Sequence, residues 1–191
     1  MNIREGGMPN QEMWESFFSP SATLQEMGLN SDCNKVVDFG CGYGTFSIPA
    51  AQITKGIVYA VDIAGEFIAE CKRKAKEAGL KTIICKQRDF IQSGVGLSNN
   101  SVDYAMLFNI LHAENPVTIL QEAYRVLSPL GKVGVIHWNY DPTTPRGPSM
   151  NIRPRPEQCQ EWMKLAGFEL VKPYINLPPY HYGIVGQKPQ A

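Results

Sequence analysis

The chain of 191 residues has the length of one globular domain, which leaves no room for a second domain of similar size. Its 18 basic and 18 acidic side chains cancel, so no overall field attracts nucleic acid or an anionic membrane surface. With 43% hydrophobic and 19% charged residues, the composition is that of an ordinary globular protein and excludes the disordered and collagen-like classes.

The sequence shows no pattern of an export signal, a membrane helix or a disulfide scaffold. The stretch Met1 to Gly7 has no apolar run, and no segment approaches the roughly 18 to 20 apolar residues that a membrane helix needs. The five cysteines form no C-x-x-C pair. We therefore expect a soluble, cytoplasmic protein with reduced thiols, no membrane partner and no bound metal.

The first thirty residues are predicted to form a helical cap. Met13, Trp14, Phe17 and Phe18 share one face of a helix predicted over Pro9 to Phe18, and Leu24 and Met27 belong to a second short helix. Residues 31–191 are predicted to form the main domain. In that domain β-branched runs alternate with helical segments, as in a parallel sheet with crossover helices.

The main domain begins with four predicted strands and the helices between them. The expected strands are 35–39, 57–62, 82–86 and 102–108. The expected helices are 45–53, 65–78 and 116–127, with Gly79 ending the second and Pro116 opening the third. This alternation predicts an α/β fold.

The last sixty residues are predicted to end the sheet differently. A fifth strand is expected at 132–138, and the segment from Pro142 to Pro156 then holds five of the fourteen prolines, which predicts a long loop. A helix follows at 156–165. Two late strands, 168–175 and 182–187, are joined by a link too short for a crossover helix, so they should pair antiparallel.

A glycine-rich turn follows the first strand of this domain, at Asp38-Phe39-Gly40-Cys41-Gly42-Tyr43-Gly44. Glycines let backbone N–H groups approach a ligand, and the start of the next helix favours negative groups there. Asp62 ends the second strand, where a carboxylate can accept hydrogen bonds from two ribose hydroxyls. Asp89 follows the third strand. The pattern predicts a nucleoside-containing cofactor at this edge of the sheet.

These residues resemble the class I S-adenosylmethionine-dependent methyltransferases, most closely the small-molecule group with the D-x-G-x-G-x-G signature, over about residues 34–186. The resemblance implies a three-layer Rossmann-like fold with a seven-stranded sheet whose last strand is antiparallel. It also implies that S-adenosylmethionine is the cofactor and S-adenosylhomocysteine the product. The segment Arg125 to Lys132 matches the family motif R-x-L-x-P-x-G-x, which precedes the fifth strand.

The family pattern assigns cofactor roles residue by residue. Asp38 and the turn would hold the amino acid end, Asp62 the ribose, and Ile63 the adenine face, while Asp89 and the Phe90 backbone would read the adenine edge. The segment from Phe108 to His112, which includes Asn109, matches the family region that lines the methionine part. The cofactor-binding residues expected in this way are Asp38, Phe39, Gly40, Cys41, Gly42, Gly44, Asp62, Ile63, Asp89, Phe90 and Asn109.

Methyl transfer asks for alignment, exclusion of water and, for some acceptors, removal of a proton. The candidate general bases are His112 and His137, each near the carboxyl end of a predicted strand. The loop after the fifth strand carries arginines and permits a small anionic acceptor. The expected substrate-binding residues are Trp14, His112, Trp138, Asn139, Arg146 and Arg153. We expect the loop and the N-terminal helix to close the acceptor pocket.

Several alternatives remain open at this point. Trp14 and its neighbours are also typical of a helix that packs on the domain without covering a ligand. Asp38 is also typical of a residue that braces a loop, and the two histidines are typical of buried hydrogen-bonding groups. A nicotinamide oxidoreductase is disfavoured because the turn reads G-x-G-x-G instead of G-x-G-x-x-G. A thiol-directed arsenic methyltransferase lacks a recognisable cysteine trio. A module that binds the cofactor without catalysis stays open, as do the acceptor atom and the oligomeric state.

Overall fold

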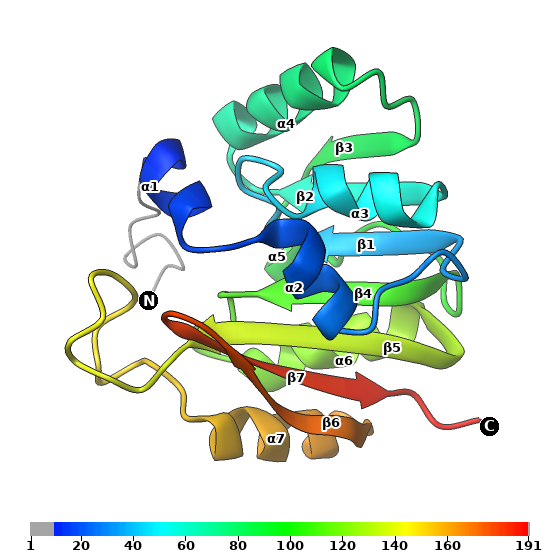
Figure 1. Ribbon diagram of the computed structural model, residues 1–191. Helices are drawn as coiled ribbons and strands as arrows, with labels where there is room; N and C mark the ends of the chain where they lie inside the picture. The colour runs from blue at the N-terminus through cyan, green and yellow to red at the C-terminus, as the bar shows by residue number, and fades with distance from the viewer. Residues whose placement is uncertain (1–9, 191) are drawn as a thin grey trace.

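The computed structural model describes residues 10–190, so the predicted helix start at Pro9 and the segment Met1 to Gly7 lie outside the described residues. Strands and helices alternate along the chain (Figure 1). The strands are β1 (Lys35–Phe39), β2 (Ile57–Asp62), β3 (Ile83–Gln87), β4 (Val102–Phe108), β5 (Leu127–Trp138), β6 (Glu169–Leu177) and β7 (His181–Gln187). The helices are α1 (Gln11–Ser16), α2 (Pro20–Glu26), α3 (Ser47–Thr54), α4 (Gly65–Glu77), α5 (Phe90–Ser93), α6 (Pro116–Val126) and α7 (Pro156–Leu165).

The strands form a seven-stranded sheet in the order β3-β2-β1-β4-β5-β7-β6. The pairs from β3 to β5 are parallel, whereas β7 runs antiparallel to both β5 and β6. This arrangement confirms the predicted α/β sheet with an antiparallel last strand. The direction in which successive strands are added reverses between β1 and β4, and ligands of open α/β sheets bind at such a switch point.

Helices cover both faces of the sheet, which gives three layers. Along β1, Val36 packs in the cluster formed with α1, α2 and α3, whereas Val37 packs in the cluster formed with α6 and α7. Successive side chains of a strand point to opposite faces, so Asp38 lies on the same face as Val36. The one acidic residue of β1 therefore faces the start of α3.

Most elements lie within two residues of the predicted bounds at each end, but two differ by more. β5 begins at Leu127 because Leu127 pairs with Val102 across an irregularity in the β4–β5 ladder, whereas the prediction began at Lys132. The short helix α5 was not predicted. Asp89 caps it by accepting hydrogen bonds from the N–H groups of Ile91 and Gln92. Four residues give no periodicity from which such a turn can be recognised.

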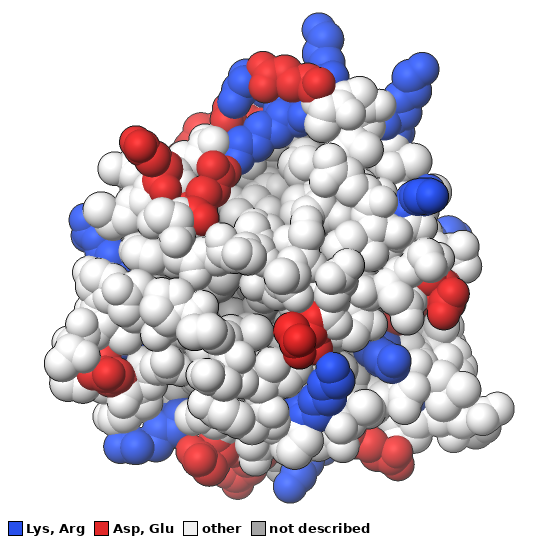
Figure 2. Space-filling model, in the orientation of Figure 1, with Lys and Arg blue, Asp and Glu red and all other residues white. Residues whose placement is uncertain are grey.

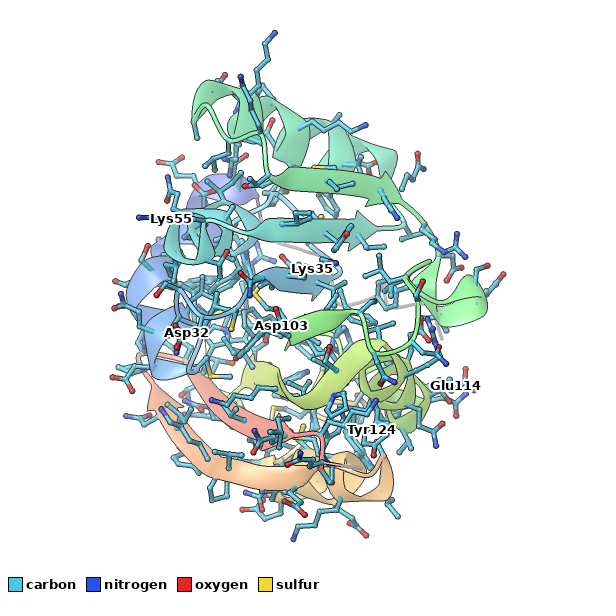
Figure 3. The ribbon with its side chains drawn as sticks, turned by 90° about the vertical axis from the view of Figure 1, so that its right-hand side faces the viewer. Asp32, Lys35, Lys55, Asp103, Glu114 and Tyr124 are labelled. Atoms are coloured by element: carbon cyan, nitrogen blue, oxygen red, sulfur yellow. The ribbon has the colours of Figure 1, made fainter. Side chains whose placement is uncertain are left out.

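Polar contacts fix the sheet at the edge where β1 and β4 begin, which Figure 3 shows with Lys35 and Asp103 side by side. The Asp103 carboxylate accepts hydrogen bonds from the backbone N–H groups of Asn34 and Lys35, at 2.8 and 2.9 Å. The hydroxyl of Tyr104 donates to the carbonyl of Met27, just after α2, at 2.7 Å. The N-terminal segment is thus attached to the sheet.

Within residues 10–190, no helix has the length and apolar character to cross a membrane.

Candidate functional site

A cavity of about 890 Å³ opens at the carboxyl ends of β1, β2 and β4, on the side of α1 in Figure 1. Pockets that hold small molecules have volumes of about 300 to 1,000 Å³. Twelve of the predicted site residues line it: Trp14, Asp38, Gly40, Cys41, Gly42, Asp62, Ile63, Asp89, Phe90, Asn109, His112 and Trp138. The cavity lies where the strand order reverses, as the sheet topology requires.

The glycine-rich turn forms one wall of the cavity through its backbone. Gly40, Gly42 and Gly44 have φ angles of +73°, +49° and +76°, a region in which side chains other than glycine are strained. A Cβ on Gly44 would also lie 2.8 Å from the Sγ atom of Cys71. Glycine at position 44 therefore allows α4 to pack closely against the turn. Gly44 does not line the cavity.

Asp62 holds the turn to the end of β2. One carboxylate oxygen accepts from the Gly42 N–H at 2.9 Å and the other from the Ala64 N–H at 2.9 Å. Burial raises the pKa of Asp62, while these N–H donors lower it in part. Each carboxylate oxygen can accept a further hydrogen bond, which is what a pair of neighbouring hydroxyls would supply.

Asp38 lies in the wall of the cavity beneath the turn. Its carboxylate accepts a hydrogen bond of 2.6 Å from the hydroxyl of Ser47 in the first turn of α3. Burial raises the pKa of Asp38 to about 7, even though this hydrogen bond lowers it. Asp38 thus both braces the helix and lines the cavity, so the two roles weighed for it are compatible.

Asn109 lies at the opposite wall, directly after β4. It has φ = +58°, and its backbone N–H donates to the carbonyl of Ile136 at 2.7 Å. Both polar atoms of its side-chain amide are buried and have no hydrogen-bond partner among the described residues. Backbone strain together with an unsatisfied amide is typical of residues that meet a ligand.

The two candidate bases form a pair. Nδ1 of His112 lies 3.3 Å from Nε2 of His137, and only His112 lines the cavity. His137 is fully buried, and burial together with the neighbouring His112 lowers its pKa well below the usual value. His137 is therefore neutral at physiological pH and reaches the cavity only through His112.

The arginines of the loop lie outside the cavity. Arg153 is buried, and its guanidinium donates to the carbonyls of Pro148, Asn139, Asp141 and Arg146 and to the Thr144 hydroxyl, over 2.7 to 3.3 Å. Every N–H-bearing nitrogen of this side chain is thus engaged inside the loop.

These contacts change the role expected for Arg153. Instead of contacting a substrate, it shapes residues 139–148, of which Gly147 and Pro148 line the cavity. Arg146 is exposed and, like Asn139, does not line the cavity. The predicted substrate contacts of all three residues thus find no support in their positions.

Three further lining residues, Phe46, Phe108 and Pro148, were not predicted to bind the substrate, although Phe108 begins the segment expected to line the methionine part. Phe46 and Phe108 belong to the same packed cluster as Trp14 and Trp138, and Pro148 lines the cavity with them. Phe46 comes two residues after the last glycine of the turn and Phe108 ends β4, so their places at strand and turn ends could have identified them. Phe39 points to the other face and packs on Phe90, at 5.5 Å between ring centroids.

The residues at the cavity fit S-adenosylmethionine. The turn offers backbone close to the ligand space, Asp62 can accept from ribose hydroxyls, and Asn109 has an unsatisfied amide. Among residues 10–190, no three His, Cys, Asp or Glu side chains lie so that they could hold a metal ion.

Comparisons with known proteins agree with this geometry. Residues 36–131 match the family model of the methyltransferase domain. The chain is 26% identical over 114 residues to a demethylmenaquinone methyltransferase of Anoxybacillus flavithermus, covering 58% of this chain and 47% of that protein. It is 36% identical over 70 residues to an aklanonic acid methyltransferase of a Streptomyces species, covering 35% of this chain and 32% of that protein.

The chain therefore spans about half or less of the length of these curated relatives. The crystal structure of a SAM-dependent methyltransferase from Aquifex aeolicus superposes with a TM-score of 0.82 at 22% identity, covering 98% of both chains, which shows the shared fold. The family model covers more than half of the 191 residues. The chain belongs to the class I S-adenosylmethionine-dependent methyltransferase family.

Proposed function

We propose that this chain transfers the methyl group of S-adenosylmethionine to a small-molecule acceptor. The observation that carries the proposal is the Asp62 carboxylate, which binds the glycine-rich turn through Gly42 and still lines a cavity at the switch point of the sheet. The names of the curated relatives, which act on a demethylmenaquinone and on aklanonic acid, support a small-molecule acceptor.

The cofactor would occupy the side of the cavity formed by β1, β2 and α5. In this arrangement Asp38 and the turn hold its amino acid end, Asp62 its ribose, and Ile63, Asp89 and Phe90 its adenine. Asp38 and Asp62 lie in the last two positions of their strands, and Ile63, Asp89 and Phe90 come within three residues of a strand end, so the backbone fixes their positions before the ligand arrives. Such preorganisation lowers the entropic cost of binding.

When bound, S-adenosylmethionine supplies an activated methyl group together with its own leaving group. The task of the protein is then to align the acceptor, exclude water and remove a proton where the acceptor carries one. Trp14 and Pro148 cover the cavity from α1 and from the loop. His112 is the proposed general base, and the neutral His137 orients its ring through the 3.3 Å contact.

Calorimetry tests the proposal against its competitors. Titration with S-adenosylmethionine, S-adenosylhomocysteine and NADH should show binding of both sulfur ligands and none of NADH. Binding of NADH alone would favour the oxidoreductase. Binding of the sulfur ligands without production of S-adenosylhomocysteine, over a panel of small acceptors, would favour a module that binds the cofactor without catalysis.

A further inference from the structure

One end of the cavity is built from aromatic and apolar side chains. We call the group formed by Trp14, Phe46, Phe108, Trp138 and Pro148 the aromatic end. The rings of Phe46 and Phe108 lie 4.8 Å apart between centroids and meet edge to face, and those of Trp14 and Trp138 lie 6.4 Å apart. These five residues come from α1, the start of α3, the ends of β4 and β5, and the loop.

A second layer of rings holds this surface in place. Phe17 packs edge to face on Trp138 at 5.3 Å, and Phe18 packs on Trp14 at 5.0 Å. Both tryptophans are more than nine-tenths buried. Because ring contacts fix the tryptophans from behind, the aromatic end offers preformed ring surfaces to a ligand.

The charged residues that line the cavity are all acidic: Asp38, Asp62, Glu66, Asp89 and Glu114. Neither lysine nor arginine lines it among the described residues. Arg155, the remaining arginine of the loop, lies over the ring of Tyr140 at 3.8 Å. On the face shown in Figure 2, blue side chains lie in the upper and lower parts, whereas the atoms at the bottom of the hollow near its centre are white. The described side chains that line the cavity therefore offer no cationic partner of fixed charge to an anionic acceptor.

We infer that the aromatic end binds a neutral, planar aromatic acceptor. This inference rests on the proposed function, because the acceptor must lie beside the cofactor. Well-placed ring pairs stabilise a complex beyond the burial of their area alone. A carboxylate at the aromatic end would lose its hydration without a basic side chain of the cavity lining to pair with it. A cationic acceptor would lie near the positive sulfonium, which repels it.

Three compounds with the same ring system test the charge: 2-naphthol, 2-naphthoate and 2-naphthylmethylammonium. Each is titrated into the protein saturated with sinefungin, a cofactor analogue that carries an ammonium group where S-adenosylmethionine has its sulfonium, and tryptophan fluorescence is followed. We expect 2-naphthol to bind at least tenfold more tightly than either charged compound. Equal or tighter binding of a charged compound overturns the inference, and so does failure of all three to bind while S-adenosylhomocysteine binds.

Two matched variants locate the binding site. Trp14→Leu should weaken the binding of 2-naphthol about fivefold to tenfold and leave the affinity for S-adenosylhomocysteine unchanged. Trp162→Leu, the same change on α7 and on the other face of the sheet, should change neither affinity. If Trp14→Leu melts below the assay temperature, Phe108→Leu replaces it with the same expectation.

Equal 2-naphthol affinities in Trp14→Leu and the wild type overturn the inference but leave the proposed function standing. If the wild type does not bind S-adenosylhomocysteine, both the inference and the proposed function are overturned.

Discussion

The two ends of the cavity are built in different ways. The cofactor end comes from β1, β2, α5 and the turns that follow the strands, all between residues 38 and 93, and its key contacts are hydrogen bonds to the backbone. The aromatic end collects side chains from α1, β4, β5 and the loop, between residues 14 and 148, and its key contacts join rings.

This difference separates what the backbone fixes from what packing fixes. At the cofactor end a carboxylate meets N–H groups whose positions follow from the sheet. At the aromatic end the wall exists only when α1 and the loop lie against the sheet. Substitutions at the first end should change cofactor affinity alone, whereas substitutions at the second should change acceptor binding and stability.

The largest effect is expected at the cofactor end, from Asp62→Asn. The variant loses the negative charge that accepts hydrogen bonds from the Gly42 and Ala64 N–H groups and, as expected, from the ribose hydroxyls. Hydrogen bonds to a charged group contribute about 1.5 to 3 kcal/mol each, so calorimetry should show affinity for S-adenosylhomocysteine reduced about 100-fold. Binding of 2-naphthol alone should change little.

Asp32→Asn is the control, because Asp32 lies at the edge of the sheet opposite the cavity (Figure 3). It should leave cofactor affinity within about twofold, since a surface charge far from the site is screened by salt. Equal affinities in Asp62→Asn and in the wild type would place the cofactor elsewhere.

Arg153→Gln is expected to act at the aromatic end. Glutamine can replace only part of the contacts that Arg153 makes in the loop, so several carbonyls lose their donor. The free energy of unfolding should fall by about 2 to 4 kcal/mol. The acceptor KM should rise about tenfold with the affinity for S-adenosylhomocysteine unchanged.

Arg146→Gln makes the same chemical change at an exposed position of the same loop and should leave both constants unaltered. If the acceptor KM rose in Arg146→Gln and not in Arg153→Gln, the loop would instead contact the acceptor through Arg146.

The same contrast explains how far the sequence could predict the molecule. The spans of β1, β2, β4 and α7 were predicted to the residue. Their apolar positions and the turn-forming residues beside them mark where each element begins and ends. The cofactor-end residues follow one another along strand ends, so a pattern in the sequence identified them.

The aromatic end was predicted only in part. Trp14 and Trp138 were predicted to bind the substrate, but Phe46, Phe108 and Pro148 were not, because their proximity to the tryptophans arises from packing between remote segments. Arg153 was assigned to the substrate because sequence cannot show that five acceptors in its own loop surround it. Long-range contacts of this kind leave no periodic signal.

His181, which packs against the rings behind the aromatic end, is expected to make the free energy of unfolding depend on pH. Its ring packs between Trp138 and Phe18, and burial, with the nearby charge of Arg153, lowers its pKa to about 3. The folded protein therefore keeps this imidazole neutral between about pH 3 and the ordinary histidine pKa near 6.5, while the unfolded chain binds a proton. The unfolding free energy consequently falls as the pH falls through this window.

Urea denaturation of wild type and His181→Phe between pH 4.5 and 6 measures this contribution. The wild type should lose about 1.4 kcal/mol more per pH unit than the variant. Asp38 at the cofactor end acts in the opposite direction, because its raised pKa makes the folded state bind the proton more readily. That contribution is common to both proteins and cancels in the difference. Parallel pH profiles would mean that His181 is protonated in the folded state.

Cys41→Ala should have the smallest effect, although Cys41 lines the cavity inside the glycine-rich turn. Its pKa is raised: the thiol of Cys71 lowers it, but burial and the carboxylates of Asp38 and Asp62 raise it, so the residue stays a neutral thiol. Its Sγ lies 3.7 Å from the Gly42 carbonyl, which is a long contact. We expect calorimetry to give an affinity for S-adenosylhomocysteine within about twofold of wild type, since a weak thiol donor contributes little. A loss above tenfold would show that the side chain, and not the backbone of the turn alone, contacts the cofactor.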